Sequence, residues 1–220
     1  DRTEAWERNK IDEITDYDRR DLSGVWGYDG VGAAFRTPPP LTARGQELYN
    51  TTLAEQRTQD GAWLYGQGSE KDYGLLDCDP LGWPRMYIYN YGFEFVMLPD
   101  RVLQFMELEH TWRTIWTDGR ALPEDPPVLN WLGWNVGHWE GDTLVVESNG
   151  YDDRSWIDRT RAAGDTPGGG LPHSDQMRVV ERYTRTTFGT LEADLTLFDP
   201  TVYAEPWVTE TATIKLVPDT

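Results

Sequence analysis

Alternation of apolar and polar side chains is the clearest pattern in this sequence, and it predicts β-strands. The cleanest example spans residues 191–198, where four apolar side chains share one face of the predicted strand: Leu191, Ala193, Leu195 and Leu197. Similar runs predict strands at residues 22–26, 86–89, 93–98, 102–108, 111–116, 177–187 and 207–216. Turns rich in Gly, Pro and Asp separate many of these runs at hairpin spacing, which favours an antiparallel sheet.

Residues 133–158 contain the strongest hairpin signal. A strand ends near Trp139, Glu140-Gly141-Asp142 forms a short polar turn, and the apolar run of residues 143–146 begins a second strand. The hairpin leads into residues 151–156, a loop dense in Asp, Arg and aromatic side chains. Loops at the rim of a barrel or sandwich often carry function, so we expect functional residues here.

One helix is predicted outside the sheet, with Thr42 as its N-cap and its end near Arg57. Residues 61–84 are rich in Gly and Pro and are expected to form a loop, part of which could wrap over a barrel end. Residues 1–20 are expected to form an N-terminal arm that docks on the body. Together these elements predict a mainly β fold: an antiparallel, lipocalin-like β-barrel in a single domain of residues 21–217, with one or two peripheral helices.

Composition narrows the classes of function. The 220 residues include 38 acidic and 20 basic side chains, for a formal net charge of −18. Binding to nucleic acid or to an anionic membrane surface needs clustered cations, so the sequence argues against both partners. No apolar run approaches a membrane span, so no membrane insertion is expected. Eleven Trp and eleven Tyr suit either an aromatic core or a cavity for a small molecule.

The loop Pro172-His173-Ser174-Asp175 holds the first catalytic candidate. A histidine that titrates near neutral pH acts as a general base or acid when a carboxylate orients its ring. We therefore assign His173 this role, with Asp175 or Asp153 as its partner. The alternative is a loop histidine that only hydrogen-bonds the backbone.

Glu109 and His110 form the second candidate, as the group that opposes His173. On a regular strand Glu107 and Glu109 would share one face and His110 the other. A turn near His110 would let Glu109 and His110 both approach the site. The alternative is that the two glutamates form a solvated strand face.

The aspartates and the arginine of the loop at 151–156 have two interpretations. Asp152 and Asp153 could act on a substrate together with Arg154, or Arg154 could close the loop through a structural ion pair with a carboxylate. Aromatic neighbours would shape the pocket. The predicted substrate-binding residues are Trp112, Trp139, Tyr151, Arg154 and Trp156.

No metal and no cofactor are expected. The three histidines, His110, His138 and His173, lie too far apart in the sequence for a common metal-binding spacing. Cys78 is the one cysteine, has no visible activating partner, and is expected to be a buried, inert thiol. A GxSxG elbow, a GxGxxG fingerprint and a P-loop are all absent from the sequence.

Six short motifs together resemble a family of bacterial, mostly exported proteins of uncertain function. They lie at residues 21–26, 137–146, 153–158, 172–175, 180–183 and 199–200. The resemblance implies a periplasmic or secreted location after signal cleavage, and the start at Asp1 in place of Met is compatible with such processing. It implies no catalytic assignment. His138 stands where such proteins more often have Arg, which argues against a shared catalytic role for it.

The sequence predicts a cofactor-independent acid–base enzyme, a lyase, isomerase or cyclase, that acts on a small hydrophobic or cyclic compound in an aromatic barrel cavity. A second hypothesis is a non-catalytic, lipocalin-like protein that binds a hydrophobic small molecule. A third is a carbohydrate-binding module with Trp side chains as an exposed platform. The substrate and the oligomeric state stay open, and a homodimer is compatible with the sequence.

Overall fold

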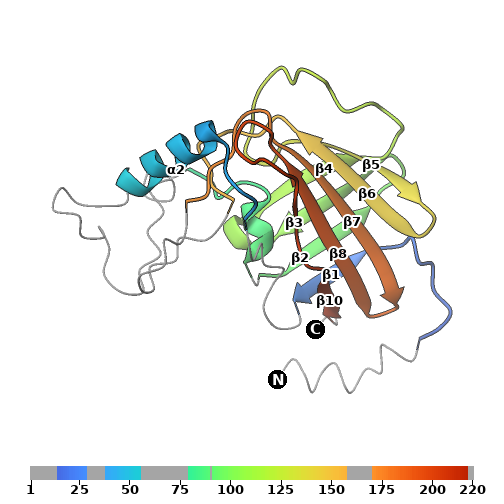
Figure 1. The fold of residues 1–220 in the computed structure, drawn as a ribbon. Helices are drawn as coiled ribbons and strands as arrows, with labels where there is room; N and C mark the ends of the chain where they lie inside the picture. Colours follow the sequence, from blue (N-terminus) through green and yellow to red (C-terminus); the bar gives the residue numbers. More distant parts are fainter. Residues whose placement is uncertain (1–13, 29–37, 56–78, 90, 158–169, 218–220) are drawn as a thin grey trace.

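The computed structural model describes residues 14–28, 38–55, 79–89, 91–157 and 170–217. Its strands in these ranges are β1 (Gly24–Tyr28), β2 (Phe93–Met97), β3 (Arg101–Met106), β4 (Thr111–Trp116), β5 (Trp134–Glu140), β6 (Thr143–Asn149), β7 (Arg178–Thr187), β8 (Thr190–Phe198), β9 (Trp207–Val208) and β10 (Ala212–Val217). They pair in the order β10-β1-β2-β3-β4-β5-β6-β7-β8-β9. A further pairing of β10 with β8 closes nine of them into a barrel, and the short strand β9 pairs with β8 (Figure 1). The predicted barrel is therefore confirmed.

The predicted hairpins are present with the expected turns. β2 and β3 flank a turn at residues 98–100, and β5 and β6 pair from Trp134↔Asn149 to Glu140↔Thr143. Gly141 has a φ of 61°, a conformation that glycine adopts without steric cost. One pairing departs from the antiparallel prediction, because β4 and β5 run parallel and share only two pairs, Ile115↔Asn135 and Trp116↔Val136. The connection of residues 117–133 places the start of β5 beside the end of β4.

Two strand predictions were wrong. Residues 86–89 lie in and after a 3₁₀ helix, η2 (Arg85–Ile88), and Met86, Tyr87 and Tyr89 are all buried. A short apolar run cannot be assigned to strand or helix by periodicity alone, and here consecutive side chains, Met86 and Tyr87, are both buried. The run at 207–216 is interrupted, giving β9 and β10 as separate strands.

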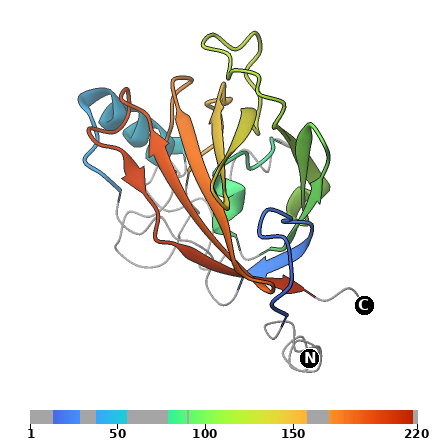
Figure 2. The ribbon, with the colours of Figure 1, turned by 90° about the vertical axis from the view of Figure 1, so that its right-hand side faces the viewer.

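The predicted helix is α2 (Ala43–Glu55), and the predicted cap is present, since the Gly45 N–H donates to Thr42 Oγ1 at 2.9 Å. A Cβ at Gly45 would lie 2.1 Å from the carbonyl oxygen of Val202, so glycine permits close packing of this helix on the loop after β8. Helix α2 and the loop of residues 117–133 both lie at the upper end of the molecule (Figure 2).

The described part of the N-terminal arm lies against the other end of the barrel. Tyr17 packs edge-on against Phe188 at a centroid distance of 5.7 Å, and its hydroxyl donates to the carbonyl oxygen of Thr186. Within the predicted arm, Tyr17 therefore contacts the barrel. Residues 1–13 lie outside the described residues.

The barrel interior combines an apolar cluster with a band of buried polar side chains. Buried aromatic and aliphatic side chains fill the side made by β8, β10, β1 and β2. On the other side, buried polar side chains lie among the apolar ones, and five consecutive strands, β3 to β7, each contribute at least one. Five of them are Gln104, Arg113, Asn135, Ser148 and Glu181. We call these five residues the polar arc. The sequence predicted an aromatic cavity inside the barrel. The structure shows that hydrogen-bonding side chains also line one side of this interior.

Candidate functional site

An ion pair without solvent contact lies at the centre of the polar arc. Arg113 Nη1 and Nη2 donate to Glu181 Oε1 and Oε2 at 2.7 and 2.5 Å, and the two side chains are 1% and 0% exposed. Arg113 also donates to Gln104, Asn135 and the Tyr183 hydroxyl, so its N–H groups make five hydrogen bonds to protein acceptors. The guanidinium is therefore saturated by the protein.

Electrostatics fix the protonation states of this cluster. Burial lowers the pKa of Arg113, but the adjacent Glu181 carboxylate outweighs burial and raises it above its ordinary value. Burial and then the same carboxylate raise the pKa of Tyr183, so its phenol stays protonated and donates to Glu181 Oε2 at 2.6 Å. The cluster consists of a paired cation and anion with a neutral phenol, which is a structural arrangement.

Residues 79–84, which we call the strap, cross this region and tie several loops together. The Leu81 N–H donates to Glu109 Oε1 at 2.9 Å, and the Trp83 N–H donates to the Trp131 carbonyl at 2.8 Å. The Arg113 guanidinium lies over the Trp83 ring, with Cζ 3.8 Å from the ring centroid. A Cβ at Gly82 would lie 2.8 Å from Ser155 Oγ, so the strap also touches the loop after β6.

His173 forms a hydrogen-bonded pair with Ser155, a residue that the sequence did not single out. Ser155 Oγ lies 2.8 Å from His173 Nε2, and His173 Nδ1 lies 3.2 Å from the Ser174 carbonyl oxygen. A carbonyl oxygen only accepts, so we infer that the proton is on Nδ1 and that Nε2 accepts from the serine hydroxyl. Burial lowers the pKa of His173, which keeps the ring neutral.

The carboxylate that supports this pair is Asp199, not the predicted Asp175. Asp199 accepts the Ser174 N–H at 2.6 Å and the Ser174 hydroxyl at 2.8 Å, so it fixes the residue whose carbonyl binds His173. Asp175 is exposed and accepts from the Gln176 side chain, because the turn after Ser174 directs it outward. Asp153 is exposed too and acts on His173 only through space, as one of several charges that raise its pKa.

The predicted turn near His110 exists as the 3₁₀ segment η3 (Leu108–His110). Glu109 and His110 have φ angles of 61° and 50°, a sparsely populated region for residues with side chains, which is associated with functional sites. Partial burial raises the pKa of Glu109. The turn brings Glu109 to Leu81 of the strap and leaves His110 exposed. A catalytic role for Glu109 or His110 stays a prediction.

Glu109 and Ser155 both contact the strap. They contact the consecutive residues Leu81 and Gly82, whose Cα atoms are about 3.8 Å apart. The Glu109 carboxyl group and the Ser155 hydroxyl therefore lie within roughly 10 Å of each other. The structure thus brings His173, through Ser155, into the neighbourhood of its predicted opposing group.

A groove of about 610 Å³ opens beside Glu109, in the barrel wall. Because β4 and β5 pair only at the end of β4, the first half of β4 faces residues 121–134 across a gap. Four tryptophans line this gap: Trp112, Trp116, Trp131 and Trp134. Arg113 reaches the groove from the polar arc. The volume is typical of a site for a small molecule.

The other predicted substrate-binding residues lie in different surroundings. Trp112 lines the groove. Tyr151 is buried behind Gly133, where a Cβ would lie 2.7 Å from the phenol ring, and its ring centroid is 6.4 Å from that of His173. Trp156 is buried near Arg85, and Trp139 is half-buried with Arg20 over its ring. For these three aromatic residues a role in binding stays a prediction.

Arg154 makes the ion pair that was the alternative interpretation of its loop. It binds both oxygens of Asp152, with its Nη2 at 2.8 Å from Oδ2, and it also lies 3.5 Å from Asp79 of the strap. Its guanidinium covers the Trp131 ring at 4.6 Å from the centroid. Arg154 therefore connects the loop after β6 to the strap and to the groove wall.

Within the described ranges no group of three or more His, Cys, Asp or Glu side chains could hold a metal ion. Cys78 lies outside those ranges. No helix in the described part of the chain has the length and apolar character needed to cross a membrane.

Comparison with known proteins gave no relatives: no protein-family model matches the chain, and no curated protein or solved structure is similar to it. The family resemblance of the six sequence motifs therefore stays a prediction.

The neutral state of His173 predicts how stability depends on pH. Its pKa is lowered in the folded protein, so the unfolded chain binds an extra proton as the pH falls below the ordinary value of 6.5. The free energy of unfolding should fall with decreasing pH in this window, by up to about 1.4 kcal/mol per pH unit from this group. Urea unfolding of wild type and His173→Gln between pH 7.5 and 5 tests this. The difference between the two proteins should shrink as the pH falls, whereas His138→Gln, at an exposed site, should parallel wild type; a constant difference for His173→Gln would contradict the assignment.

Proposed function

We propose that this protein is a cofactor-independent acid–base enzyme that acts on a small hydrophobic or cyclic compound bound in the tryptophan-lined groove. Lyase, isomerase and cyclase reactions all fit this description, since each needs one group that accepts a proton and another that donates one. The observation that carries the proposal is the Ser155–His173 hydrogen bond in a tautomer whose Nε2 is free of a proton.

The two candidate groups have pKa shifts suited to opposite roles. Burial lowers the pKa of His173 and favours its basic form, whereas partial burial raises the pKa of Glu109 and favours its acidic form. Pairs of titratable groups with such opposed environments are typical of acid–base sites. In this proposal the Ser155 hydroxyl relays a proton to His173 Nε2, and Glu109 donates one from the groove. No covalent intermediate is required.

Deuterium exchange tests the proton transfer without knowledge of the product. The protein is incubated in D₂O with a panel of small cyclic ketones, esters and alcohols, and loss of C–H signals is followed by NMR. We expect wild type to exchange or convert at least one compound, and His173→Gln and Glu109→Gln each to slow this by about 10²–10⁴-fold. His138→Gln and Glu94→Gln are matched controls at exposed positions and should retain the wild-type rate. Equal rates for His173→Gln and wild type would rule out His173 as the base.

A non-catalytic binding protein is the second candidate, and one observation favours it. His173 and Ser155 are almost fully buried, at 2% and 6% exposure, and neither lines the groove. A groove that only binds its ligand needs neither residue. In that case binding to the groove would persist in His173→Gln and no compound would exchange in wild type.

We also propose a periplasmic or secreted location, on the basis of the six sequence motifs alone. A small molecule is the proposed partner. Fractionation of cells that express the gene with its native upstream sequence would test the location, and a cytoplasmic product would contradict it.

A further inference from the structure

We propose that the groove binds an uncharged saccharide, with its pyranose rings against Trp112 and Trp134. The inference rests on the proposed function, because it names the class of compound that the same groove takes. Binding can nevertheless be measured without turnover. The argument uses three properties of the lining: which indole faces are accessible, which charges are free, and which polar groups border the aromatic surface.

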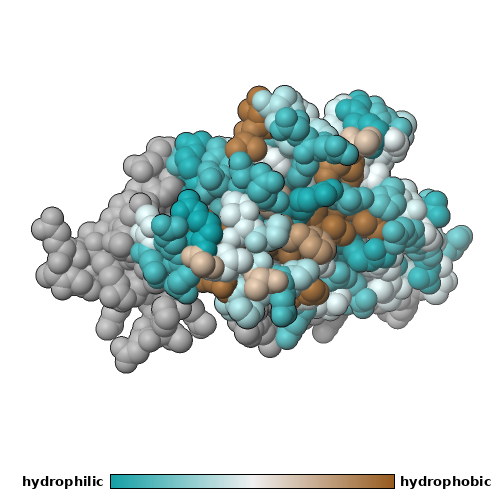
Figure 3. Space-filling model, turned by 45° about the horizontal axis from the view of Figure 1, so that its top comes forward, coloured by the Kyte–Doolittle hydropathy of each residue, from teal (hydrophilic) through white to brown (hydrophobic). Residues whose placement is uncertain are grey.

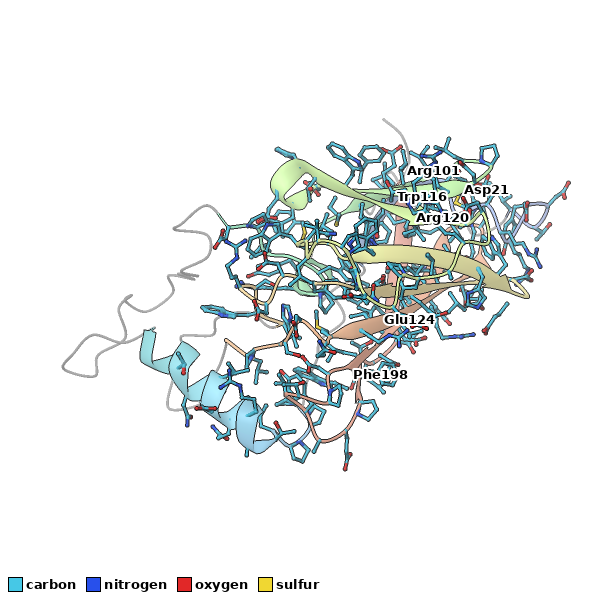
Figure 4. All side chains as sticks on the ribbon, turned by 90° about the horizontal axis from the view of Figure 1, so that it is seen from above. Asp21, Arg101, Trp116, Arg120, Glu124 and Phe198 are labelled. Carbon is cyan, nitrogen blue, oxygen red and sulfur yellow. The ribbon has the colours of Figure 1, made fainter. Side chains whose placement is uncertain are left out.

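Only some of the lining tryptophans have faces that a ligand could cover. Trp116 lies between two guanidinium groups, those of Arg101 and Arg120, at 4.1 and 3.6 Å from its ring centroid (Figure 4). Trp131 carries Arg154 on its ring at 4.6 Å. These two rings therefore form walls of the groove that are already in contact with protein cations.

Trp112 and Trp134 differ, because they are 59% and 37% exposed. Trp112 packs against Phe105 of the neighbouring strand, with centroids 6.3 Å apart, which supports the indole from one side. Both indoles line the same groove, and exposed apolar side chains that lie together mark binding sites. Separate apolar areas among polar side chains are also visible on the upper face of the molecule (Figure 3). A pyranose ring has an apolar C–H face and a polar edge, which suits a flat, exposed indole.

The charges of the groove argue against an anionic ligand. Arg113 directs its N–H groups to protein acceptors, and Arg120 binds both carboxylate oxygens of Asp118. A carboxylate or phosphate group would compete with these acceptors for the two guanidinium groups. Glu109 is the carboxyl group among the described lining residues, and its Oε1 already accepts the Leu81 N–H.

Neutral hydrogen-bonding groups border the exposed indoles. Thr111 and Thr114 flank Trp112 on β4, and Asn130 lies across the groove. Hydroxyl and amide groups both donate and accept, as the hydroxyls of a sugar require. A purely apolar ligand would leave these groups unpaired on binding, which costs free energy. The combination of exposed aromatic faces, paired charges and neutral polar groups therefore favours a hydroxylated, uncharged ring.

Calorimetric titration with hexasaccharides tests this class directly. The probes are cellohexaose, xylohexaose and maltohexaose as neutral chains, and hexagalacturonate as a chain with a carboxylate on every ring. We expect at least one neutral chain to bind and hexagalacturonate to bind at least tenfold more weakly. Trp112→Ala and Trp134→Ala should each weaken binding at least tenfold. Phe198→Ala is the matched control for Trp134→Ala, because Phe198 is 39% exposed, close to the 37% of Trp134, and lies on another side of the barrel (Figure 4).

Several outcomes would overturn the proposal. They are failure of all three neutral chains to bind, tighter binding of hexagalacturonate, and unchanged affinity in both tryptophan variants. Tighter binding of 1-naphthol than of any saccharide, lost in Trp112→Ala, would assign the groove to an apolar ligand instead. Saccharide binding by wild type together with an absence of exchange would reject the acid–base enzyme and leave the binding site intact.

Discussion

Replacing Arg113 with methionine is expected to lower the free energy of unfolding by about 3–5 kcal/mol. Methionine has a similar length but no charge, so Glu181 would be left in the barrel interior without a counter-ion. Gln104 and Asn135 would each lose a donor as well. Urea unfolding followed by tryptophan fluorescence measures the change. This is the largest effect that we expect from a single substitution.

Two further variants test the cause of that effect. In Arg113→Met/Glu181→Leu the buried carboxylate is gone, so most of the lost stability should return, because apolar replacements of a buried pair are often neutral. Arg120→Met breaks an exposed pair with Asp118 and should change stability far less. A double variant as unstable as Arg113→Met would show that packing around Trp83, and not the unpaired charge, dominates.

Replacing Asp199 with alanine is expected to cost about 3 kcal/mol. The substitution removes the acceptor of the Ser174 N–H and of the Ser174 hydroxyl, both of which are buried. The Val202 N–H loses the Asp199 side chain but still donates to the Asp199 carbonyl oxygen. Buried donors without acceptors carry most of the cost of a lost hydrogen bond. Asp175→Ala is the matched control one residue from Ser174, and it should stay close to wild type since Asp175 is exposed.

The Asp199 substitution should also affect His173. The Ser174 carbonyl holds His173 Nδ1, so loosening Ser174 should change the environment of the imidazole ring. NMR signals of the His173 ring should shift in Asp199→Ala and remain in place in Asp175→Ala. Unchanged His173 signals, together with wild-type stability, would contradict the role given to Asp199.

Local sequence patterns predicted most of the barrel. Alternation, turn residues and the Thr42 cap are local signals, and they placed the hairpins and helix α2 correctly. The parallel pairing of β4 with β5 depends on the path of residues 117–133, which no local signal encodes. The same limit explains the error at residues 86–89, where the burial of the consecutive residues Met86 and Tyr87 removes the periodicity that separates a strand from a helix.

The candidate site was less predictable, because its contacts join residues far apart in the chain. His173 was identified by residue type. Its hydrogen-bond partner Ser155 lies 18 residues away in the sequence, and Asp199, which binds the neighbouring Ser174, lies 25 residues from Ser174. One signal for the polar arc was present. Glu181 stands between Val179 and Tyr183 on the inward face of β7, where a charge predicts a buried partner.

Because β4 and β5 share only two residue pairs, the closure of the barrel and the shape of the groove depend on different parts of the chain. The remaining strand pairs fix the size and closure of the barrel, whereas residues 121–134 define one side of the groove and form few ladder bonds. Insertions or substitutions in that segment would alter the width and chemistry of the groove while the nine-stranded ring stays closed. Ligand preference can thus diverge between relatives at little cost in stability, and library mutagenesis for new specificities should begin in this segment.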